Sequence, residues 1–188
     1  MKKYTLILAV LFMSTFVFGQ EKGTHDLGSF VGYNSSNEYL NAAEVLNSNG
    51  TYQNTKATLS YGLNYKIASA NNWFFYADGV YQGMTEDVLE NNVQVGDVSH
   101  TYLTFGFGTE FHYIHGDWFQ MYSGGSIAYT QHSAKYTTSS PNFDNVNKGF
   151  FNWQINALGF RFGKKIAATL ELGAGYKGYA NFGVSIQF

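Results

Sequence analysis

Apolar and polar residues alternate one by one over long stretches of this sequence. In residues 101–113, aromatic and aliphatic side chains take most alternate positions from Leu103 to Tyr113, and glycine, threonine, glutamate and histidine fall between them. Residues 56–67, 166–177 and 180–188 repeat the pattern. A period of two places successive side chains on opposite faces of a β-strand, and about ten residues are enough for a tilted strand to cross a bilayer. We therefore predict a strand in each segment.

Weaker alternation marks four more strands. They are Asp26–Asn34, Trp73–Gln82, Trp118–Thr130 and Phe151–Phe162. The connections alternate in length: 68–72, 115–117 and 163–165 are short, whereas 35–54, 84–99 and 131–149 are long and polar, and the last connection, at 177–178, is tight. Short periplasmic turns, long outer loops and an even strand number are typical of bacterial membrane barrels. The predicted fold is all-β, an eight-stranded antiparallel transmembrane β-barrel with up-and-down meander topology.

Three irregularities add detail to this prediction. Arg161 shares the parity of apolar Trp153 and Ile155, so we expect a bulge near Leu158–Gly159 or an interfacial position for Arg161. Alternation continues into two of the long loops, which indicates strands that project beyond the bilayer as an exposed sheet; the positions are Val93, Val95, Val98, Ala134 and Tyr136. A short surface helix is a hypothesis for Glu38–Leu46, with Leu40, Ala43 and Leu46 on one side.

The amino terminus has the pattern of a secretory signal peptide. Lys2 and Lys3 precede the apolar run Leu6–Phe18, and small residues at Val17 and Gly19 suit a cleavage site after Gly19. The predicted organisation is a signal peptide over 1–19 and a barrel domain over 20–188. An uncleaved anchor is the alternative, but the run is short for a bilayer span. Beyond Gln20 no apolar run approaches a membrane helix, so the mature chain would cross a membrane as a closed barrel.

Composition excludes several classes of function. The chain has no cysteine, which excludes disulfides, thiolate metal sites and thiol nucleophiles. Its formal charge is −2, and loss of Lys2 and Lys3 with the signal peptide gives −4. No basic patch exists to hold nucleic acid, so we expect no nucleic-acid partner. Aromatic residues make up 19% of the chain, with 21 glycines and one proline, as in a β-rich protein with many close backbone contacts.

Alternation alone does not say which face of the barrel is wet. The positions between the apolar ones are rich in glycine, serine, threonine and asparagine, which fit a narrow eight-stranded lumen. Trp73 and Trp118 each follow a short turn, so both are predicted to lie at one membrane interface rather than in a core. The sequence ends on an aromatic residue after an alternating strand, Phe182, Val184, Ile186 and Phe188. These features favour a membrane barrel over a soluble secreted β-protein.

The chain resembles the small OmpA/OmpX-type outer-membrane β-barrels, especially porin-family barrels of Bacteroidota. The likeness rests on Gly19-Gln20, on Gly159–Lys165, on Glu171–Gly178 and on the ending Gly183–Phe188. It covers the whole mature chain in architecture, but its specific motifs lie in the last 30 residues. The resemblance implies an integral outer-membrane location, contact with outer-membrane lipid, and a terminal strand read by the barrel-assembly machinery. That signal would comprise Phe182, Gly183, Val184, Ile186 and Phe188. Gln187 departs from the family pattern, in which arginine often precedes the final phenylalanine.

Charged residues on the inward parity predict an ion-pair network in the lumen. Its predicted members are Lys66, Asp78, Glu110, Arg161 and Glu171. We expect Asp78, Glu110 and Glu171 at one depth, because Asp78 and Glu110 lie at similar distances from the short turns that flank their strands and Glu171 is similarly placed. Confined carboxylates need cationic partners, and Lys66 and Arg161 are the candidates. A packed, structural network is the first interpretation, and a proton or ion path gated by it is the alternative.

Catalysis is not expected from the histidines. His132 and Ser133 are neighbours and so point to opposite faces of a strand, which suits neither as the base of the other. His112 and His115 have opposite parities, so we expect no shared metal site. No phosphate loop or cofactor motif is present. We predict a non-enzymatic barrel with a packed or narrow lumen, without metal or cofactor, acting in envelope structure or in surface contacts through its long loops. A small-solute or ion pore and a lipid-modifying enzyme are the alternatives.

Overall fold

The computed structural model describes residues 23–47, 51–70 and 72–188. In this part of the chain, nine strands and one helix follow each other along the sequence. They are β1 (His25–Tyr33), α2 (Ser36–Asn47), β2 (Tyr52–Ala57), β3 (Ser60–Ala70), β4 (Trp73–Glu90), β5 (Val93–His115), β6 (Phe119–Thr138), β7 (Val146–Gly163), β8 (Ile166–Gly175) and β9 (Ala180–Gln187). The predicted signal peptide, 1–19, lies outside the described residues.

Every paired strand runs antiparallel to its neighbour, and the sheet closes on itself. The order is β3-β1-β9-β8-β7-β6-β5-β4, and β4 pairs with both β5 and β3. β2 pairs with β4 beyond the end of β3, so the two short strands form one interrupted wall segment. Counted this way, the described residues form the predicted eight-stranded antiparallel barrel. Closure leaves the ring without free strand edges. A sheet in lipid must close in this way, because lipid offers no hydrogen-bonding partners for the backbone groups of an open edge.

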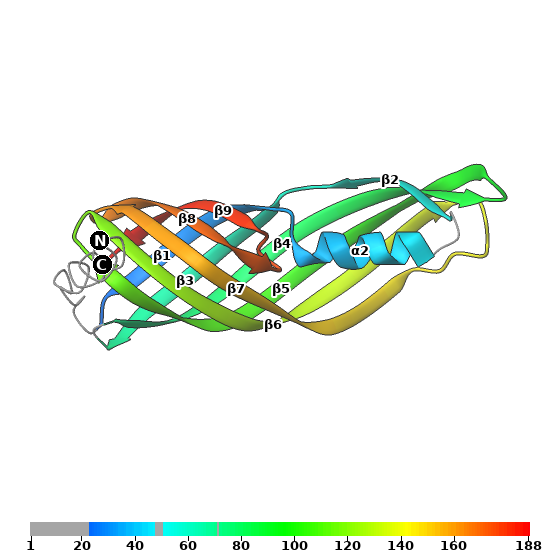
Figure 1. Ribbon diagram of the computed structural model, residues 1–188. Coiled ribbons are helices and arrows are strands. Elements are labelled where there is room, and N and C mark those ends of the chain that lie inside the picture. Colours follow the sequence, from blue (N-terminus) through cyan, green and yellow to red (C-terminus); the bar gives the residue numbers. More distant parts are fainter. Residues whose placement is uncertain (1–22, 48–50, 71) are drawn as a thin grey trace, which may run out of the picture.

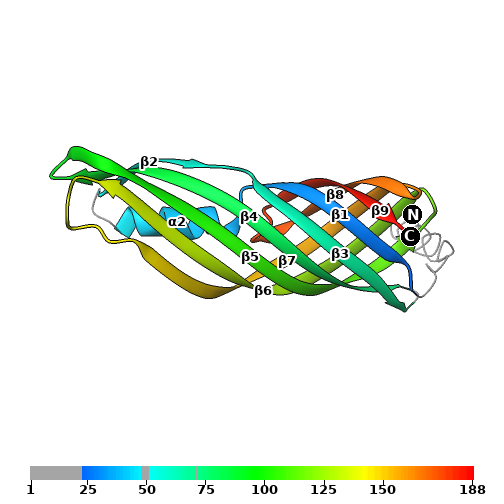
Figure 2. The same ribbon diagram turned by 180° about the vertical axis from the view of Figure 1, so that it is seen from behind.

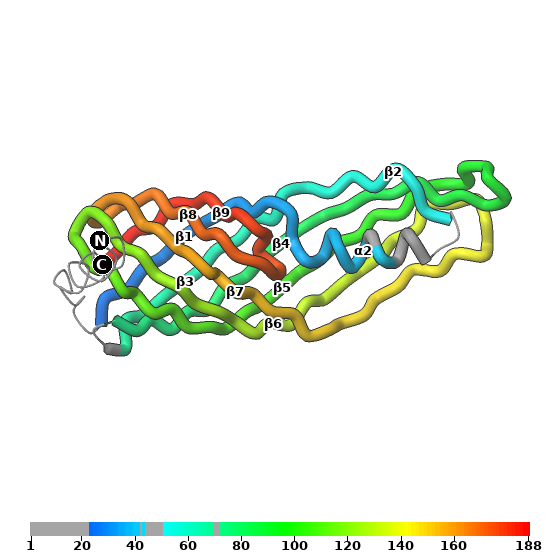
Figure 3. Tube along the Cα trace, viewed as in Figure 1, coloured from blue at the N-terminus to red at the C-terminus, as the bar shows by residue number. Residues whose placement is uncertain are grey.

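The barrel has two parts of unequal height. β5 has 23 residues and β6 has 20, whereas β8 and β9 have 10 and 8. About ten residues are enough to cross a bilayer, so β4–β7 are longer than one crossing needs. Figure 3 shows their ends away from the C-terminus, here called the upper ends, extending well beyond the turn between β8 and β9. β2 adds to the same projecting sheet, so its order is β2-β4-β5-β6-β7. This confirms the sheet predicted from the alternation in the long loops.

The hairpin of β4 and β5 replaces the long loop expected at 84–99. Glu90 pairs with Val93, and the two residues between them, Asn91 and Asn92, have φ values of 50° and 64°. Positive φ at both central residues defines the tight turn whose twist suits a hairpin, and asparagine tolerates it better than most residues. The apolar positions Val93, Val95 and Val98 therefore lie in a strand that follows a tight turn, not in a loop.

Helix α2 lies on the concave side of the projecting sheet. Figure 1 shows α2 in front of the projecting strands, and Figure 2, turned by 180°, shows those strands in front of α2. The helix begins with a capping interaction in which the Ser35 backbone N–H donates to Glu38 Oε1 at 3.1 Å. The predicted helix is confirmed: Leu40 and Ala43 are exposed, whereas the polar Asn37 and Asn41 are buried against the sheet. In the described part of the chain, no helix has the length and apolar character needed to cross a membrane.

Side chains of the lower barrel are sorted in the reverse of a soluble protein. Those pointing outward form a continuous apolar band, with Phe105, Ile127 and Phe182 each more than 60% exposed. Those pointing inward are mostly polar or charged, and Lys66, Glu110 and Arg161 are all buried. Water would favour the opposite arrangement, because each exposed apolar side chain forgoes about 25 cal/mol per Å² of burial. The surface therefore suits a hydrocarbon surrounding.

The parity conflict around Arg161 is resolved by a bulge. β7 changes register against both neighbours at this point, and Ala157 and Leu158 are two consecutive outward residues. The extra residue turns the Arg161 side chain into the lumen, where it is buried. The bulge expected near Leu158–Gly159 is confirmed, and an interfacial position for Arg161 is excluded.

Candidate functional site

The centre of the lumen holds a lysine between two glutamates. Lys66 Nζ donates to both carboxylate oxygens of Glu110, at 2.8 and 2.9 Å, and lies 3.5 Å from Glu171 Oε1. Tyr122 and Asn156 donate to Glu171 at 2.9 and 3.0 Å. All five side chains are buried. A buried charge is tolerated only when it is paired and hydrogen-bonded, and here each carboxylate has a cation and further partners.

Two more ion pairs continue the network toward the ends of the barrel. On the turn side, Arg161 Nε lies 3.3 Å from Asp26 Oδ2, and Ser185 links the two by accepting from Arg161 and donating to Asp26. On the loop side, Lys177 Nζ lies 2.9 Å from Asp78 Oδ2, and the Tyr176 hydroxyl donates to the same carboxylate. Together with the central lysine and its two glutamates, these two ion pairs line the lumen with positive and negative charges.

The structure thus joins the predicted network members in a different order. Lys66, Glu110 and Glu171 meet, but Asp78 and Glu110 do not share a depth, because the β4–β5 register places Asp78 opposite Gly106 and Glu110 opposite Phe74. Asp78 and Arg161 pair instead with Lys177 and Asp26, which sequence reasoning missed. Lys177 sits in the tight turn after β8, next to Gly175 and Gly178, whose φ values are 136° and 116°. Those glycine conformations turn the backbone so that the Lys177 side chain enters the lumen. In the sequence, the spacing of these glycines was the available signal of the turn.

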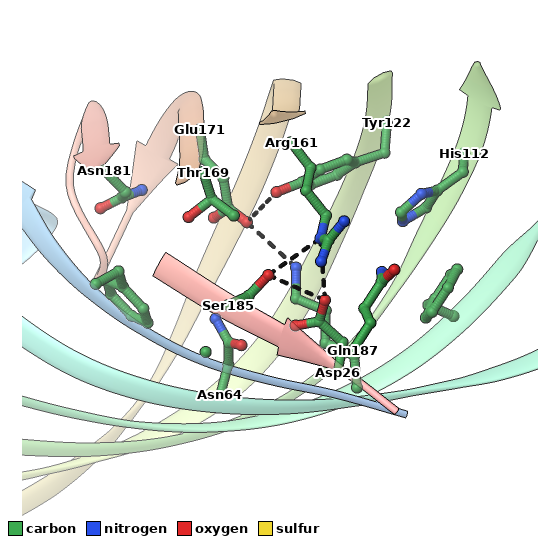
Figure 4. A pocket seen from close by; sticks show the side chains of 14 residues that line it. Asp26, Asn64, His112, Tyr122, Arg161, Thr169, Glu171, Asn181, Ser185 and Gln187 are labelled. Atoms are coloured by element: carbon green, nitrogen blue, oxygen red, sulfur yellow. Dashed lines mark hydrogen bonds and ion pairs between the residues drawn. The ribbon is translucent and has the colours of Figure 1, made fainter. Parts of the chain in front are cut away.

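The lumen is closed by its own side chains. Figure 4 shows Asp26, Tyr122, Arg161 and Glu171 converging from different strands on the space between them. The void that remains there is about 10 Å³. A void of this size is about what one water molecule needs. This geometry agrees better with the packed lumen expected from the sequence than with a continuous channel.

The turn-side end of the lumen carries a histidine pair that the sequence argument had separated. β5 changes register between His112 and Ile114, so Tyr113 is an extra residue. The bulge turns both His112 and His115 inward, and their rings stack with centroids 4.9 Å apart. The expectation of opposite faces is therefore wrong. Within the described residues, no group of three histidine, aspartate or glutamate side chains is arranged to hold a metal ion.

At the opposite end, α2 covers the mouth of the lumen through polar contacts. Asn37 donates to Gln82 Oε1 at 3.2 Å, and Asn152 donates to Asn37 Oδ1 at 3.2 Å. Asn41 donates to Glu86 Oε1 at 2.5 Å. These bonds join α2 to β4 and β7, so the helix is attached to the wall by hydrogen bonds more than by apolar packing.

Glu86 in turn contacts a second histidine pair, above the apolar band. Its Oε2 lies 3.5 Å from His100 Nε2, and His100 Nδ1 lies 3.0 Å from His132 Nε2. Burial acts to raise the pKa of Glu86, but the His100 ring, 3.5 Å away, and hydrogen bonds from Thr55 and Asn41 outweigh it and lower this pKa below its usual value. Burial, together with the nearby His100 and Lys148, lowers the pKa of His132 to about 4. At neutral pH this end therefore holds a charged glutamate and an uncharged His132.

The remaining predicted residues, except Gly183, lie on the outer wall. Trp73 and Trp118 are exposed near the short turns, and the Trp73 ring stacks obliquely on Phe111 at 5.1 Å. In the terminal strand, Phe182, Val184 and Ile186 point outward, and Gly183 faces the lumen beside Ser29 and Thr169. Phe188 exchanges two backbone hydrogen bonds with His25, both 2.9 Å long, where β9 meets β1 and closes the ring.

Comparison with known proteins identifies the type of β-barrel fold. No protein-family model matches the sequence, and no curated protein sequence matches it. Among solved structures, the N-terminal β-barrel domain of Pseudomonas aeruginosa OprF matches with a TM-score of 0.52 and 11% identity, covering 90% of this chain and 100% of that one. Ail, the attachment invasion locus protein of Yersinia pestis, in complex with the heparin analogue sucrose octasulfate, matches with a TM-score of 0.49 and 10% identity, covering 89% and 100%. The chain has the fold of the OmpA-like outer-membrane β-barrels.

Proposed function

We propose that this chain is an integral outer-membrane β-barrel whose lumen is packed and whose role lies in envelope structure or in surface contacts. The observation that carries the proposal is the inverted sorting of side chains, with an apolar outer band around buried Lys66, Glu110 and Arg161. Only a closed barrel or a helix satisfies every backbone hydrogen bond in lipid. The shared fold with the OprF barrel domain supports the same location.

Heat-modifiable migration on SDS gels tests the membrane barrel. A folded barrel keeps its closed sheet in SDS until it is boiled, so unboiled and boiled samples of the membrane fraction should migrate differently. Identical migration, with the protein in the soluble fraction, would refute the proposal. The terminal-strand hypothesis has its own test. Replacing Phe188 by alanine should lower the amount of heat-modifiable barrel in the outer membrane, whereas replacing the exposed Ile127 should leave it unchanged.

The projecting sheet is the part of the molecule best suited to surface contacts. Two strands lie at the edges of this sheet: among the described strands, β2 pairs with β4 alone, and the part of β7 that precedes Gln154 pairs with β6 alone. Edge strands are the places where a second chain can add to a sheet. We propose that this sheet, with α2, is the interacting surface. Deleting its upper part, 86–98, should abolish surface contacts in a cell-binding assay and preserve the heat-modifiable barrel.

A pore and an enzyme are the alternatives, and each has a decisive measurement. The void of about 10 Å³ between the charged groups supports a non-conducting lumen, so planar-bilayer recordings of the purified protein should stay silent. Regular conductance steps would favour the pore. For the enzyme, lipid A mass spectra should be unchanged between deletion and overexpression strains. We also propose, on the motifs 159–165 and 171–178, that the barrel is of the porin-family type of Bacteroidota.

A further inference from the structure

An apolar groove lies where α2 meets the outer wall, beyond the ends of β8 and β9 (Figure 1). Its volume is about 440 Å³, and most of its lining comes from Tyr39, Leu40, Phe151, Trp153 and Tyr179. The exposed fractions of these five residues range from 45% for the two tyrosines to 87% for Phe151. Pockets for small molecules have volumes of about 300–1,000 Å³, so the groove has room for a ligand.

The polar side chains on the floor of the groove are already hydrogen-bonded within the protein. Ser36 Oγ donates to Asn152 Oδ1 at 3.2 Å, and Asn152 Nδ2 donates to Asn37 Oδ1 at 3.2 Å. The Trp153 N–H donates to Asn152 Oδ1 at 2.9 Å, and the Trp153 carbonyl oxygen accepts from the Tyr176 N–H at 3.1 Å. A peptide or a sugar would bury polar groups of its own here without partners, which is unfavourable. A hydrocarbon chain has no such groups and matches this floor.

The groove continues the apolar band that faces lipid. Along β7, the outward residues Ile155, Trp153 and Phe151 are all apolar and exposed, so the band runs into the groove without a break. On the next strand, Tyr129 pairs with Phe151 and is 48% exposed. Among the described residues that line the groove, none is charged. The medium that covers the band, lipid hydrocarbon, is therefore also the medium that meets the groove.

The groove lies at the boundary between the apolar band and the polar surface above it. Beyond Tyr129, the outward residues of β6 are Gln131, Ser133 and Lys135. At the edge of the groove, the rings of Tyr39 and Tyr179 have centroids 5.6 Å apart. Tyrosine is favoured at membrane interfaces, because its ring is apolar and its hydroxyl group is polar. Short turns of such barrels face the periplasm, so this boundary belongs to the outer leaflet.

We propose that the groove binds one acyl chain of an outer-leaflet lipid, with the lipid headgroup beyond Tyr39 and Tyr179. The chain packs between Leu40 of α2 and Phe151 and Trp153 of β7. It fills the space between the helix and the wall with hydrocarbon. Because no cation lines the groove, binding depends on the acyl chain and not on the charge of the headgroup. The site rests on the proposed outer-membrane location and adds one defined lipid position to it.

Native mass spectrometry of the full chain in dimyristoylphosphatidylcholine nanodiscs tests the site. We expect one lipid to stay bound at a collision energy that removes the other lipids. Ala174→Phe places a ring in the groove and should lower the retained fraction about tenfold, because it displaces methylene groups of the chain. Ala77→Phe, at an exposed position on the lipid-facing side of β4, is the matched control and should retain the lipid. Dimyristoylphosphatidylglycerol should be retained as well as the zwitterionic lipid.

A second pair of variants lies on α2 and serves if Ala174→Phe does not fold. Leu40→Asp places a carboxylate at an exposed position in the groove, where a hydrocarbon chain would remove its water. Ala43→Asp adds the same charge to an exposed position of the same helix outside the groove lining. We expect loss of the retained lipid in Leu40→Asp and unchanged retention in Ala43→Asp.

Heat-modifiable migration of the same preparations separates failure of the site from failure of the barrel. A heat-modifiable unmodified chain that retains no lipid would overturn the acyl-chain site and leave the membrane barrel intact. Equal retention in Leu40→Asp and Ala43→Asp would do the same. A protein dimer in place of the lipid adduct would overturn the site in favour of a second copy of the chain. Identical migration of the unmodified chain before and after boiling would refute both the barrel and the site.

Discussion

Removing Lys66 should destabilise the barrel more than removing the lysine together with its partner. In Lys66→Met, Glu110 loses a cation that contacts both of its oxygens, at 2.8 and 2.9 Å, and Glu171 loses one at 3.5 Å. Glu110 has no exposed surface, so water does not replace the lost contacts. Breaking a buried pair in this way costs about 3–5 kcal/mol, because a charge is left without compensation.

The double variant Lys66→Met/Glu110→Gln should recover most of that loss. It removes both charges and leaves an amide that can bond to neighbouring groups, and replacing a whole buried pair is often close to neutral. We therefore expect the double variant to lie within about 1–2 kcal/mol of the parent, with a coupling free energy of about 2–3 kcal/mol between the two positions. Lys56→Met, at an exposed position on β2, is the matched control and should change stability by less than 0.5 kcal/mol, the usual size for an exposed site.

Reversible urea unfolding in lipid vesicles, followed by tryptophan fluorescence, measures these differences. The three tryptophans of the chain report loss of the lipid-facing environment. If Lys66→Met costs less than about 1 kcal/mol and shows no coupling to Glu110→Gln, the central pair is solvated. The lumen would then be wet, and the argument for a packed, non-conducting barrel would fail.

Three further substitutions test other parts of the structure. Gly32→Ala should prevent a heat-modifiable barrel, because a Cβ there would overlap the Lys177 carbonyl oxygen, whereas Gly83→Ala, with its nearest atom at 3.4 Å, should fold. Tyr122→Phe removes the 2.9 Å bond to Glu171 and should lower the urea midpoint by an amount equivalent to about 1–3 kcal/mol; Tyr81→Phe, on the exposed face, should not. Asn92→Val should destabilise the β4–β5 hairpin by about 1–2 kcal/mol, because its φ is 64°. Faster hydrogen exchange confined to the hairpin would show this, and unchanged exchange would contradict it.

The alternation of residues was enough to predict the closed barrel, its eight wall segments and its short turns. It did not predict that much of the long connections expected at 84–99 and 131–149 is strand. Period-two patterning determines which side chains share a face, and in a closed sheet it determines the inside and the outside together. It also predicted the projecting sheet, because apolar residues such as Val93, Val95, Ala134 and Tyr136 still recur at alternate positions beyond the bilayer span.

Register and bulges were the part that alternation did not determine. A parity conflict revealed the bulge before Arg161, because an arginine on the lipid face is costly. No such conflict marked the bulge at Tyr113, since tyrosine is acceptable on either face of a membrane strand, and the inward turn of both His112 and His115 was missed. Lys177 was missed for a different reason: it lies in a turn, where period two does not apply and glycine conformations decide the direction of a side chain.

The interrupted wall segment formed by β2 and β3 separates the strand pairing of the projecting sheet from the closure of the ring. In the described chain, β2 hydrogen-bonds to β4 alone among the strands, so fraying of β2 opens no contact of the closed ring. The ring and the projecting sheet can therefore differ in local unfolding free energy, with slow hydrogen exchange below and faster exchange above. Such a division lets the upper part tolerate substitutions, insertions or even replacement by another loop, while the lower ring retains the sequence needed to fold.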